Sequence, residues 1–558
     1  MFNKSFVWQQ LLALVFFSSS ISCEKPDIPT PPTKTCFVGG IDTCTTVVKV
    51  LDAKILLTEE FQTIQNFGAS DCWGIKFVGK YWPLSKRNEI ADLLFSKDFD
   101  ADGNPKGIGL SLWRINIGAG SFEQGVNSKI NSEWRREECF QDSSGNYDWT
   151  KQAGNRWFAK AAKDRGVENL LLFSISAPVH MTKNGLATGS ADPSDVGKIN
   201  LKVGKMGDYA DFLAEVAKYY NQSGMPINYL SPINEPQWDW KLGANGTASQ
   251  EGTSVTNDEA FQLVKELNEK IKIKNIQTKI AFGEVAAWNY SAGVVSNNVN
   301  RSDIFNVFWN PTSSSYIGNF PTVEKVLSSH SYGAQSDVSN LLSHRDKMVK
   351  RIASINPTIN SWQSEYCVLG TEDQIQGPVR DLGIKAALYI ARVIHTDLAI
   401  GNVSAWQWWL GVSPSDYKDG LVYITDVNGA MGENANTKND GLIYRSKMLW
   451  ALGNFSRFIR PGMIRVNAQL ENYTNITDAA VGLMMSAYKN PLTRELVIVV
   501  INMTDKSEKL KLSGLSLASS TLKSYTTTDT KEMKFSETTA ENITIEAKSI
   551  TTFIGTYK

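Results

Sequence analysis

Two short stretches, Asn228-Tyr-Leu-Ser-Pro-Ile-Asn-Glu-Pro236 and Ile359-Asn-Ser-Trp-Gln-Ser-Glu-Tyr366, decide the fold. Each is a strand-like run with a glutamate at its end, Glu235 in the first and Glu365 in the second. In a parallel β/α barrel the functional side chains project from the C-terminal ends of the strands. Two strand-ending glutamates therefore predict a barrel with both acids at one face.

The runs between and around these stretches repeat a strand-then-helix pattern. Helical patterns such as 209–220 and 258–272 separate the predicted strands. The predicted strands are 63–69, 108–115, 170–175, 228–233, 279–282, 326–330, 359–364 and 403–408. Eight such units favour a closed (β/α)8 TIM barrel. A doubly wound open sheet is the alternative, but no glycine-rich dinucleotide fingerprint opens any of the helices.

The sequence pattern changes after Pro461, where short runs of alternating apolar and polar residues are separated by polar turns. This pattern predicts a small antiparallel β-sandwich. Residues 46–59 alternate in the same way before the barrel begins, so we expect them to pair with the C-terminal sheet and make that domain discontinuous. The predicted domains are a β-sandwich of residues 46–62 and 455–558 and a catalytic barrel of residues 63–454.

The N-terminus has the form of an export signal. Residues 1–22 combine Lys4 with a short apolar run, and Ser20-Ile-Ser-Cys23 resembles a bacterial lipobox without its usual leucine. We expect a signal peptide, lipidation of Cys23 and a proline-rich lipid-anchored linker over residues 23–45, as in an outer-membrane or cell-surface lipoprotein. Ordinary cleavage and secretion is the alternative.

Composition excludes several classes of function. Lys+Arg and Asp+Glu balance at 57 each, which argues against nucleic-acid binding and leaves the Cys23 anchor as the one expected membrane contact. With four His and no Cys-x-x-Cys motif, neither a metal site nor a cofactor is expected. Cys36 and Cys44 are close enough in sequence to form a disulfide. We expect a monomer whose 16 Trp include rings that stack on sugars.

A pair of strand-end carboxyl groups suits one kind of chemistry. Retaining hydrolysis of a glycosidic bond needs two carboxyl groups about 5 Å apart, one to donate a proton and one to attack the anomeric carbon. A single glutamate at a strand end can equally be a helix-capping residue. Two in this register, Glu235 and Glu365, favour catalysis, with a polysaccharide or oligosaccharide as the partner.

Several motifs resemble glycoside hydrolase family 30. Trp362–Tyr366 is similar to that family's nucleophile strand, and Phe67-Gly-Ala-Ser70 to its first strand, with Asn66 and Ala69 as departures. Met448–Gly462 is similar to the segment that joins the family's barrel to its β-sandwich. The resemblance implies that Glu235 is the acid/base and Glu365 the nucleophile.

Other strand ends supply substrate-binding candidates. Glu365 must stay ionised, and Arg114 is the expected cation beside it unless it forms a purely structural salt bridge. Glu284 is as readily a helix cap, and His330 a core residue. The full set of predicted substrate-binding residues is Arg114, Asn234, Trp238, Glu284, His330, Tyr332 and Trp408, with one of the Trp rings of 406–409 expected under the sugar.

The sequence of the loop after Glu235 narrows the choice of substrate. Pro236–Trp240, followed by Ser249-Gln-Glu-Gly252, looks most like the endo-β-1,6-galactanase branch, which cleaves side chains of arabinogalactan. A β-1,6-glucanase is the second candidate and a xylanase the third. A surface glycan-binding protein with an inactive barrel is the alternative from another class, although a binding protein has no need of both glutamates.

Overall fold

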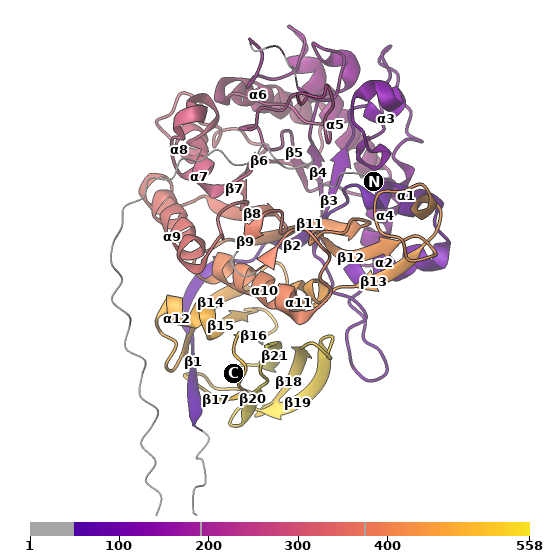
Figure 1. The fold of residues 1–558 in the computed structure, drawn as a ribbon. Coiled ribbons are helices and arrows are strands. Elements are labelled where there is room, and N and C mark those ends of the chain that lie inside the picture. Colours follow the sequence, from indigo (N-terminus) through magenta and orange to yellow (C-terminus); the bar gives the residue numbers. More distant parts are fainter. Residues whose placement is uncertain (1–48, 190–191, 193, 373–374) are drawn as a thin grey trace, which may run out of the picture. The chain divides into compact units, whose positions relative to one another are not determined.

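Eight parallel strands close into a barrel in the computed structural model of this chain (Figure 1). The structure describes residues 49–189, 192, 194–372 and 375–558. Strand β11 pairs with both β2 and β8, which closes the ring. The predicted (β/α)8 fold is therefore confirmed. The expected signal peptide, the linker and the Cys36–Cys44 pair lie outside the described residues.

The barrel strands lie close to the predicted ranges, and their ends differ at two places that matter. Strand β3 continues past Arg114, and strand β11 continues five residues past Trp408 to Ser413. The barrel strands are β2 Asn66–Ser70, β3 Leu112–Ile117, β4 Asn169–Ser174, β5 Tyr229–Ser231, β6 Lys279–Val285, β7 Val323–His330, β8 Asn360–Tyr366 and β11 Ala405–Ser413. Arg114 and Trp408 are thus inside strands and not at their ends.

Helices follow the strands and cover the barrel from outside. Helix α6 begins with a capping box, in which the Thr256 hydroxyl accepts from the Glu259 amide while the Glu259 carboxylate accepts from the Thr256 amide. The main helices are α1 Gly74–Tyr81, α2 Leu84–Phe95, α4 Ala153–Asp164, α5 Met206–Gln222, α6 Asn257–Lys274, α7 Trp288–Ala292, α8 Ile304–Trp309, α9 Val338–Ile355, α10 Ile384–Ala399 and α11 Lys447–Ser456.

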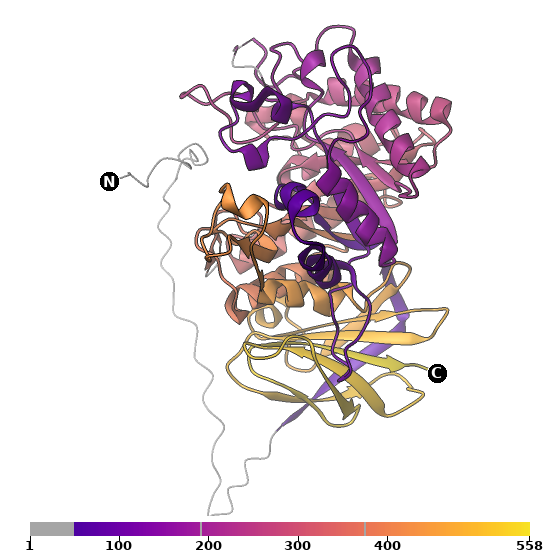
Figure 2. The ribbon, with the colours of Figure 1, turned by 90° about the vertical axis from the view of Figure 1, so that its right-hand side faces the viewer.

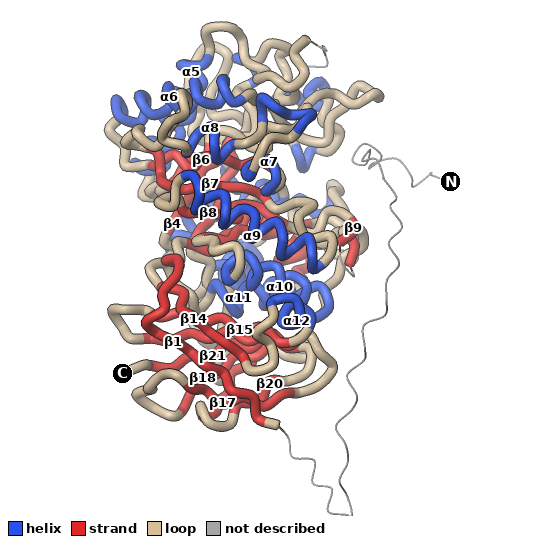
Figure 3. Tube along the Cα trace, turned by 90° about the vertical axis from the view of Figure 1, so that its left-hand side faces the viewer, coloured by secondary structure: helices blue, strands red, loops and turns tan. Residues whose placement is uncertain are grey.

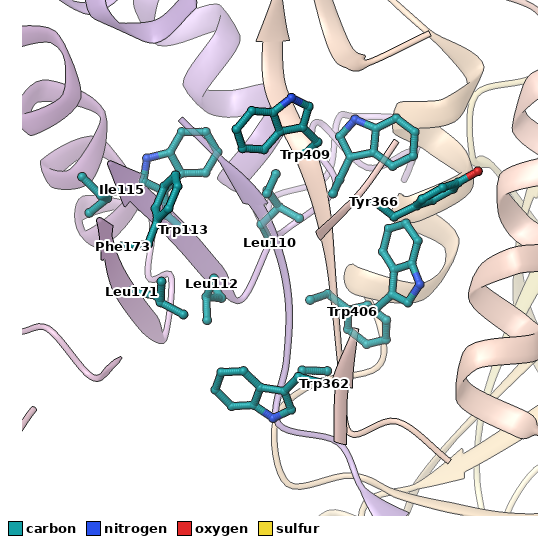
Figure 4. Close-up of a cluster of buried hydrophobic side chains, with 14 of the residues drawn as sticks. Leu110, Leu112, Trp113, Ile115, Leu171, Phe173, Trp362, Tyr366, Trp406 and Trp409 are labelled. Carbon is teal, nitrogen blue, oxygen red and sulfur yellow. The ribbon is translucent and has the colours of Figure 1, made fainter. Parts of the chain in front are cut away.

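Aromatic side chains fill much of the barrel core (Figure 4). Trp113, Trp362 and Trp406 are all buried. The Trp362 indole donates to Gln65 Oε1 at 2.7 Å, and the Trp406 indole to Asp397 Oδ2 at 2.8 Å. Buried Trp rings usually find such an acceptor. Much of the high Trp content therefore serves packing.

The C-terminal residues form one nine-stranded sheet that includes the N-terminal strand β1, Val50–Thr63 (Figure 2). Strand β1 runs antiparallel to β14 and parallel to β17. The expected pairing of the N-terminal segment with the C-terminal sheet is present. The other strands are β14 Ile464–Leu470, β15 Leu483–Lys489, β16 Glu495–Asn502, β17 Glu508–Ser513, β18 Thr521–Thr527, β19 Lys534–Thr539, β20 Ile543–Ile545 and β21 Ser549–Thr556.

One apolar cluster joins side chains from opposite ends of this sheet, among them Leu510 of β17 and Leu522 of β18. The sheet therefore curls over its own core, as a sandwich does. Helices α10 and α11 lie between this sheet and the barrel strands (Figure 3). The predicted boundary at residue 455 falls within α11, which contacts both β2 and β18.

In the described part of the chain, no helix has the length and apolar character needed to cross a membrane.

Candidate active site

Glu235 and Glu365 meet at the C-terminal face of the barrel. Glu235 follows β5, and Glu365 is the penultimate residue of β8. A ring nitrogen of His330 and one carboxylate oxygen from each glutamate all lie within 4.8 Å of one another. Both glutamates are buried, with 9% and 3% of their surface exposed. Two carboxyl groups at this spacing match the short separation of a double-displacement site.

Glu365 is held by two donors. Arg114 Nη1 donates to Glu365 Oε2, and the Tyr332 hydroxyl donates to Glu365 Oε1 at 3.0 Å. Arg114 is the cation that the sequence predicted beside this glutamate. Both contacts fix the orientation of the Glu365 carboxylate.

Arg114, on β3, contacts residues of β4, β6 and β8 and of the segment that follows β5. Its Nη2 donates to Asn234 Oδ1 at 3.0 Å and to Glu284 Oε2 at 2.8 Å. Its guanidinium carbon lies 3.8 Å from the ring centroid of Phe173 on β4. A planar guanidinium with five donors suits this arrangement, because it bonds several acceptors from one rigid group. Lysine has no equivalent geometry.

His330 bridges Glu235 and Glu284. Its Nδ1 lies 3.2 Å from Glu235 Oε1, and its Nε2 lies 3.1 Å from Glu284 Oε2. The ring has no exposed surface. From the sequence, His330 could be a core residue or a substrate-binding residue, and Glu284 could be a helix cap or a substrate-binding residue. Both belong to the buried polar network that connects the two catalytic candidates.

The charges of this network determine where protons reside. Burial lowers the pKa of His330, but Glu365, Glu235 and Glu284 outweigh it and raise that pKa to about 10. Burial raises the pKa of Glu284, but Arg114 and His330 outweigh it and lower that pKa to about 2. Burial raises the pKa of Glu235, and Glu365 adds to the increase.

Three carboxyl groups thus face two cations. With Glu284 and Glu365 ionised and Arg114 and His330 charged, the site is neutral when Glu235 holds a proton. A buried network without net charge avoids most of the cost of desolvating an unpaired ion. The arrangement therefore favours a proton on Glu235, which is the form that a general acid requires.

The backbone places these acids in an uncommon conformation. Glu235 has φ of 47° and Glu284 has φ of 52°, both in the left-handed region that non-glycine residues rarely adopt. The Glu235 amide donates to the Glu284 carbonyl at 2.8 Å. Such backbone strain concentrates at functional sites, where the surrounding structure maintains it.

The donor set does not fit a divalent cation. Glu235, His330 and Glu365 are the one cluster of three His, Cys, Asp or Glu donors that the described residues bring together. Both ring nitrogens of His330 already lie within hydrogen-bond distance of carboxylates, and Arg114 neutralises Glu365. Arg114 and His330 already supply the positive charges of this network.

The burial of the tryptophans on β11 corrects the prediction that Trp408 binds the substrate. Trp408 has no exposed surface, and its indole donates to the Asp419 carbonyl at 2.7 Å. Alternate side chains of a strand share a face, so Trp408 lies in the core with Trp406, whose ring centroid is 6.1 Å away. Trp409, the next residue, is 7% exposed and meets the Trp73 ring edge-on at 5.3 Å. The sequence motif did not separate these rings, because the register of β11 in the folded sheet decides which face each one occupies.

On the other side of the site, the Pro236–Trp240 loop supports Glu235. The Trp240 indole donates to the Glu235 carbonyl at 2.9 Å. Trp238 is half-buried and lies 6.3 Å from the ring of Tyr290, which sequence reasoning did not single out. Trp238 therefore remains available to a sugar, whereas Trp240 is engaged with the backbone.

Comparison with known proteins identifies the family. The family model described as O-glycosyl hydrolase family 30 matches residues 50–423. The chain belongs to glycoside hydrolase family 30. This confirms the resemblance read from the sequence motifs.

Solved structures share the architecture of this family 30 chain. A conserved exported protein from Bacteroides fragilis is 33% identical, with a TM-score of 0.83 over 91% of this chain and all of that one. The catalytic domain of xylanase C from Talaromyces cellulolyticus is 20% identical, with a TM-score of 0.62 over 90% of this chain and all of that one. An endo-β-1,6-glucanase is 16% identical, with a TM-score of 0.60 over 90% of this chain and 93% of that one. The last two likenesses concern the fold alone.

Among curated proteins, the glucuronoxylanase XynC of Bacillus subtilis is 31% identical over 116 residues. This match covers 21% of the family 30 chain and 20% of that relative, so it spans about a fifth of the relative's length.

Proposed function

We propose that this chain is a retaining β-glycosidase in which Glu235 is the acid/base and Glu365 the nucleophile. The observation that carries the proposal is the approach of the two carboxyl groups to within 4.8 Å. An inverting enzyme needs a wider gap to admit a water between them.

In the first step Glu365 attacks the anomeric carbon while Glu235 protonates the departing oxygen. The C–O bond to the leaving sugar breaks and a glycosyl ester of Glu365 forms. In the second step Glu235 takes a proton from water, which attacks the same carbon and releases Glu365. In both steps Arg114 holds the nucleophile, and Asn234, which accepts from Arg114, binds the sugar.

Tyr332, His330 and Glu284 act mainly by positioning. Tyr332 donates to Glu365, and His330 connects Glu235 with Glu284. Trp238 and Tyr290 flank the acid/base, which is the side of the leaving group, so we assign them to the aglycone. Trp409 replaces Trp408 as the ring expected beneath the reacting sugar.

For the substrate we propose β-1,6-galactan with endo cleavage. The Pro236–Trp240 and Ser249–Gly252 motifs support this: the Trp240 indole donates to the Glu235 carbonyl, and Gly252 lies against the Trp240 ring. A β-1,6-glucanase is the second candidate, supported by the glucanase of similar fold, and a xylanase is the third, supported by the xylanase of similar fold and by the short glucuronoxylanase match.

Incubation of the purified protein with β-1,6-galactan, with pustulan and with xylan tests the substrate. The galactanase proposal predicts short oligosaccharides from the first glycan only, and products from pustulan alone would overturn it. Glu365→Gln should bind the same glycan without cleaving it, which separates an enzyme from a glycan-binding protein.

We also propose that the chain is exported. The N-terminal segment has the composition of an export signal, and the similar Bacteroides fragilis protein is described as exported. Labelling with palmitate in cells, compared between wild type and Cys23→Ser, tests the lipid anchor.

A further inference from the structure

A second polar cluster lies at the same face of the barrel, between β11 and the loop of residues 426–441. This loop joins β12, Gly420–Thr425, to β13, Leu442–Arg445. Arg135 Nε donates to Glu433 Oε1 at 2.8 Å, and Lys438 Nζ lies 2.5 Å from Glu133 Oε2. The loop is therefore fastened to the short helix of residues 133–135.

Arg135 also stacks on one of a pair of largely buried tryptophans. Its guanidinium carbon lies 4.7 Å from the ring centroid of Trp73, which in turn contacts Trp409. Trp73 and Trp409 each keep 7% of their surface exposed. An Arg stacked on a ring, with a second ring beside it, presents both donors and an apolar face, the combination that a sugar ring contacts.

Asp419 lies beside Trp409, because β11 and β12 pair in parallel with Leu410 opposite Gly420, and it has an unpaired oxygen. It precedes β12, is 7% exposed, and its Oδ1 has no hydrogen-bond partner among the described residues. Ser413 bonds the carboxylate, and the charges of Arg135 and Glu433 act on it. Buried polar atoms are nearly always paired, with protein, water or ligand. An open carboxylate oxygen here needs a donor from outside the chain.

The position of Asp419 indicates which sugar supplies that donor. Its neighbour Lys418 pairs with Val368, three residues after the nucleophile, and Cys367 Sγ lies 3.9 Å from the Tyr332 hydroxyl that bonds Glu365. Asp419 thus lies on the nucleophile's side of the cleft, whereas Trp238 and Tyr290 lie beside the acid/base.

We propose that Asp419 binds sugar hydroxyl groups on the non-reducing side of the scissile bond, with Arg135, Trp73 and Trp409 forming the wall of that subsite. The proposal rests on the proposed glycosidase function and adds a glycan-recognising residue to it. Its ligand is a neutral sugar with free hydroxyls, since Glu433 already neutralises Arg135.

The test uses Asp419→Ala and Asp419→Asn in the full chain, with Asp346→Asn on the outer helix α9 as the control. The substrate is an oligosaccharide of whichever of the three glycans the wild type cleaves. Loss of a hydrogen bond to a charged group predicts a fall in kcat/KM of about 10–100-fold for Asp419→Ala. Asp419→Asn retains the shape and should lose less, with Tm unchanged.

Binding of the same oligosaccharide to Glu365→Gln, measured by calorimetry, should weaken by a similar factor when Asp419→Ala is added. Unchanged kcat/KM and affinity in an active protein would overturn the subsite. Loss of activity that accompanies a lowered Tm, and that Asp419→Asn does not share, would show a structural role and overturn it as well. A wild type that cleaves none of the three glycans would instead refute the proposed function.

Discussion

Replacement of Arg114 by Met tests the charge network most directly. The change removes a buried cation that bonds Glu365, Glu284 and Asn234, and it leaves two carboxylates in a buried site. Arg114 and His330 together lower the Glu284 pKa from 4.5 to about 2, which corresponds to about 3 kcal/mol in favour of the folded state at neutral pH. Breaking a buried ion pair by removing one partner costs about 3–5 kcal/mol, which agrees.

The pH dependence of this loss has a definite sign. The folded-state pKa of Glu284 lies below its unfolded value, so its contribution is present above about pH 4.5 and disappears as the pH falls toward 2. The stability difference between wild type and Arg114→Met should therefore be largest at neutral pH and shrink in acid. Denaturant unfolding at several pH values measures it.

Two further variants complete the experiment. Adding Glu284→Gln to Arg114→Met removes one orphaned charge and should recover part of the lost stability. Arg345→Met breaks another fully buried ion pair, with Asp397, and should destabilise the chain without reducing the turnover of the folded fraction. Arg114→Met should reduce turnover by about 10²–10³-fold. A variant with wild-type stability at pH 7 would refute the reasoning.

The other predictions concern single groups. Glu365→Gln should abolish hydrolysis while leaving glycan binding measurable by calorimetry, and turnover at the wild-type rate would contradict the nucleophile assignment. His330→Asn removes a hydrogen bond and a charge that lower the Glu235 pKa, so the alkaline limb of the kcat/KM profile should move to higher pH; a shift to lower pH would contradict the proton assignment. Gly283→Ala places a Cβ 2.0 Å from the Ser328 carbonyl oxygen at φ of 142° and should cost about 2–4 kcal/mol in denaturant unfolding, whereas Gly293→Ala, which meets open space, should cost little. Treatment with EDTA should leave activity unchanged, and a loss restored by added divalent ions would contradict a network that carries its own cations.

The barrel could be predicted because its signals are local. Each strand is a short apolar run followed by a polar loop and an amphipathic helix, and each of the two glutamates falls close to the end of such a run. Arg114 was also predictable as a cation for Glu365, because a nucleophilic carboxylate needs one.

The ends of the strands were less predictable, and with them the role of each aromatic ring. β11 pairs with β2 and β8, which come from distant parts of the chain, and it continues to Ser413 because its last residues pair with β12. Nothing in the run 405–409 encodes those partners. The Asp419 subsite was missed for a similar reason, since Asp419, Arg135 and Trp73 are brought together only by folded loops.

The pairing of β1 has a consequence for biosynthesis. β1 leaves the ribosome early, yet its neighbours β14 and β17 are made only after the whole barrel has been translated. Until then β1 exposes two unpaired edges, which are open to association with other chains. A chain interrupted before residue 464 would keep those edges exposed, so premature termination should produce aggregates and not a free barrel.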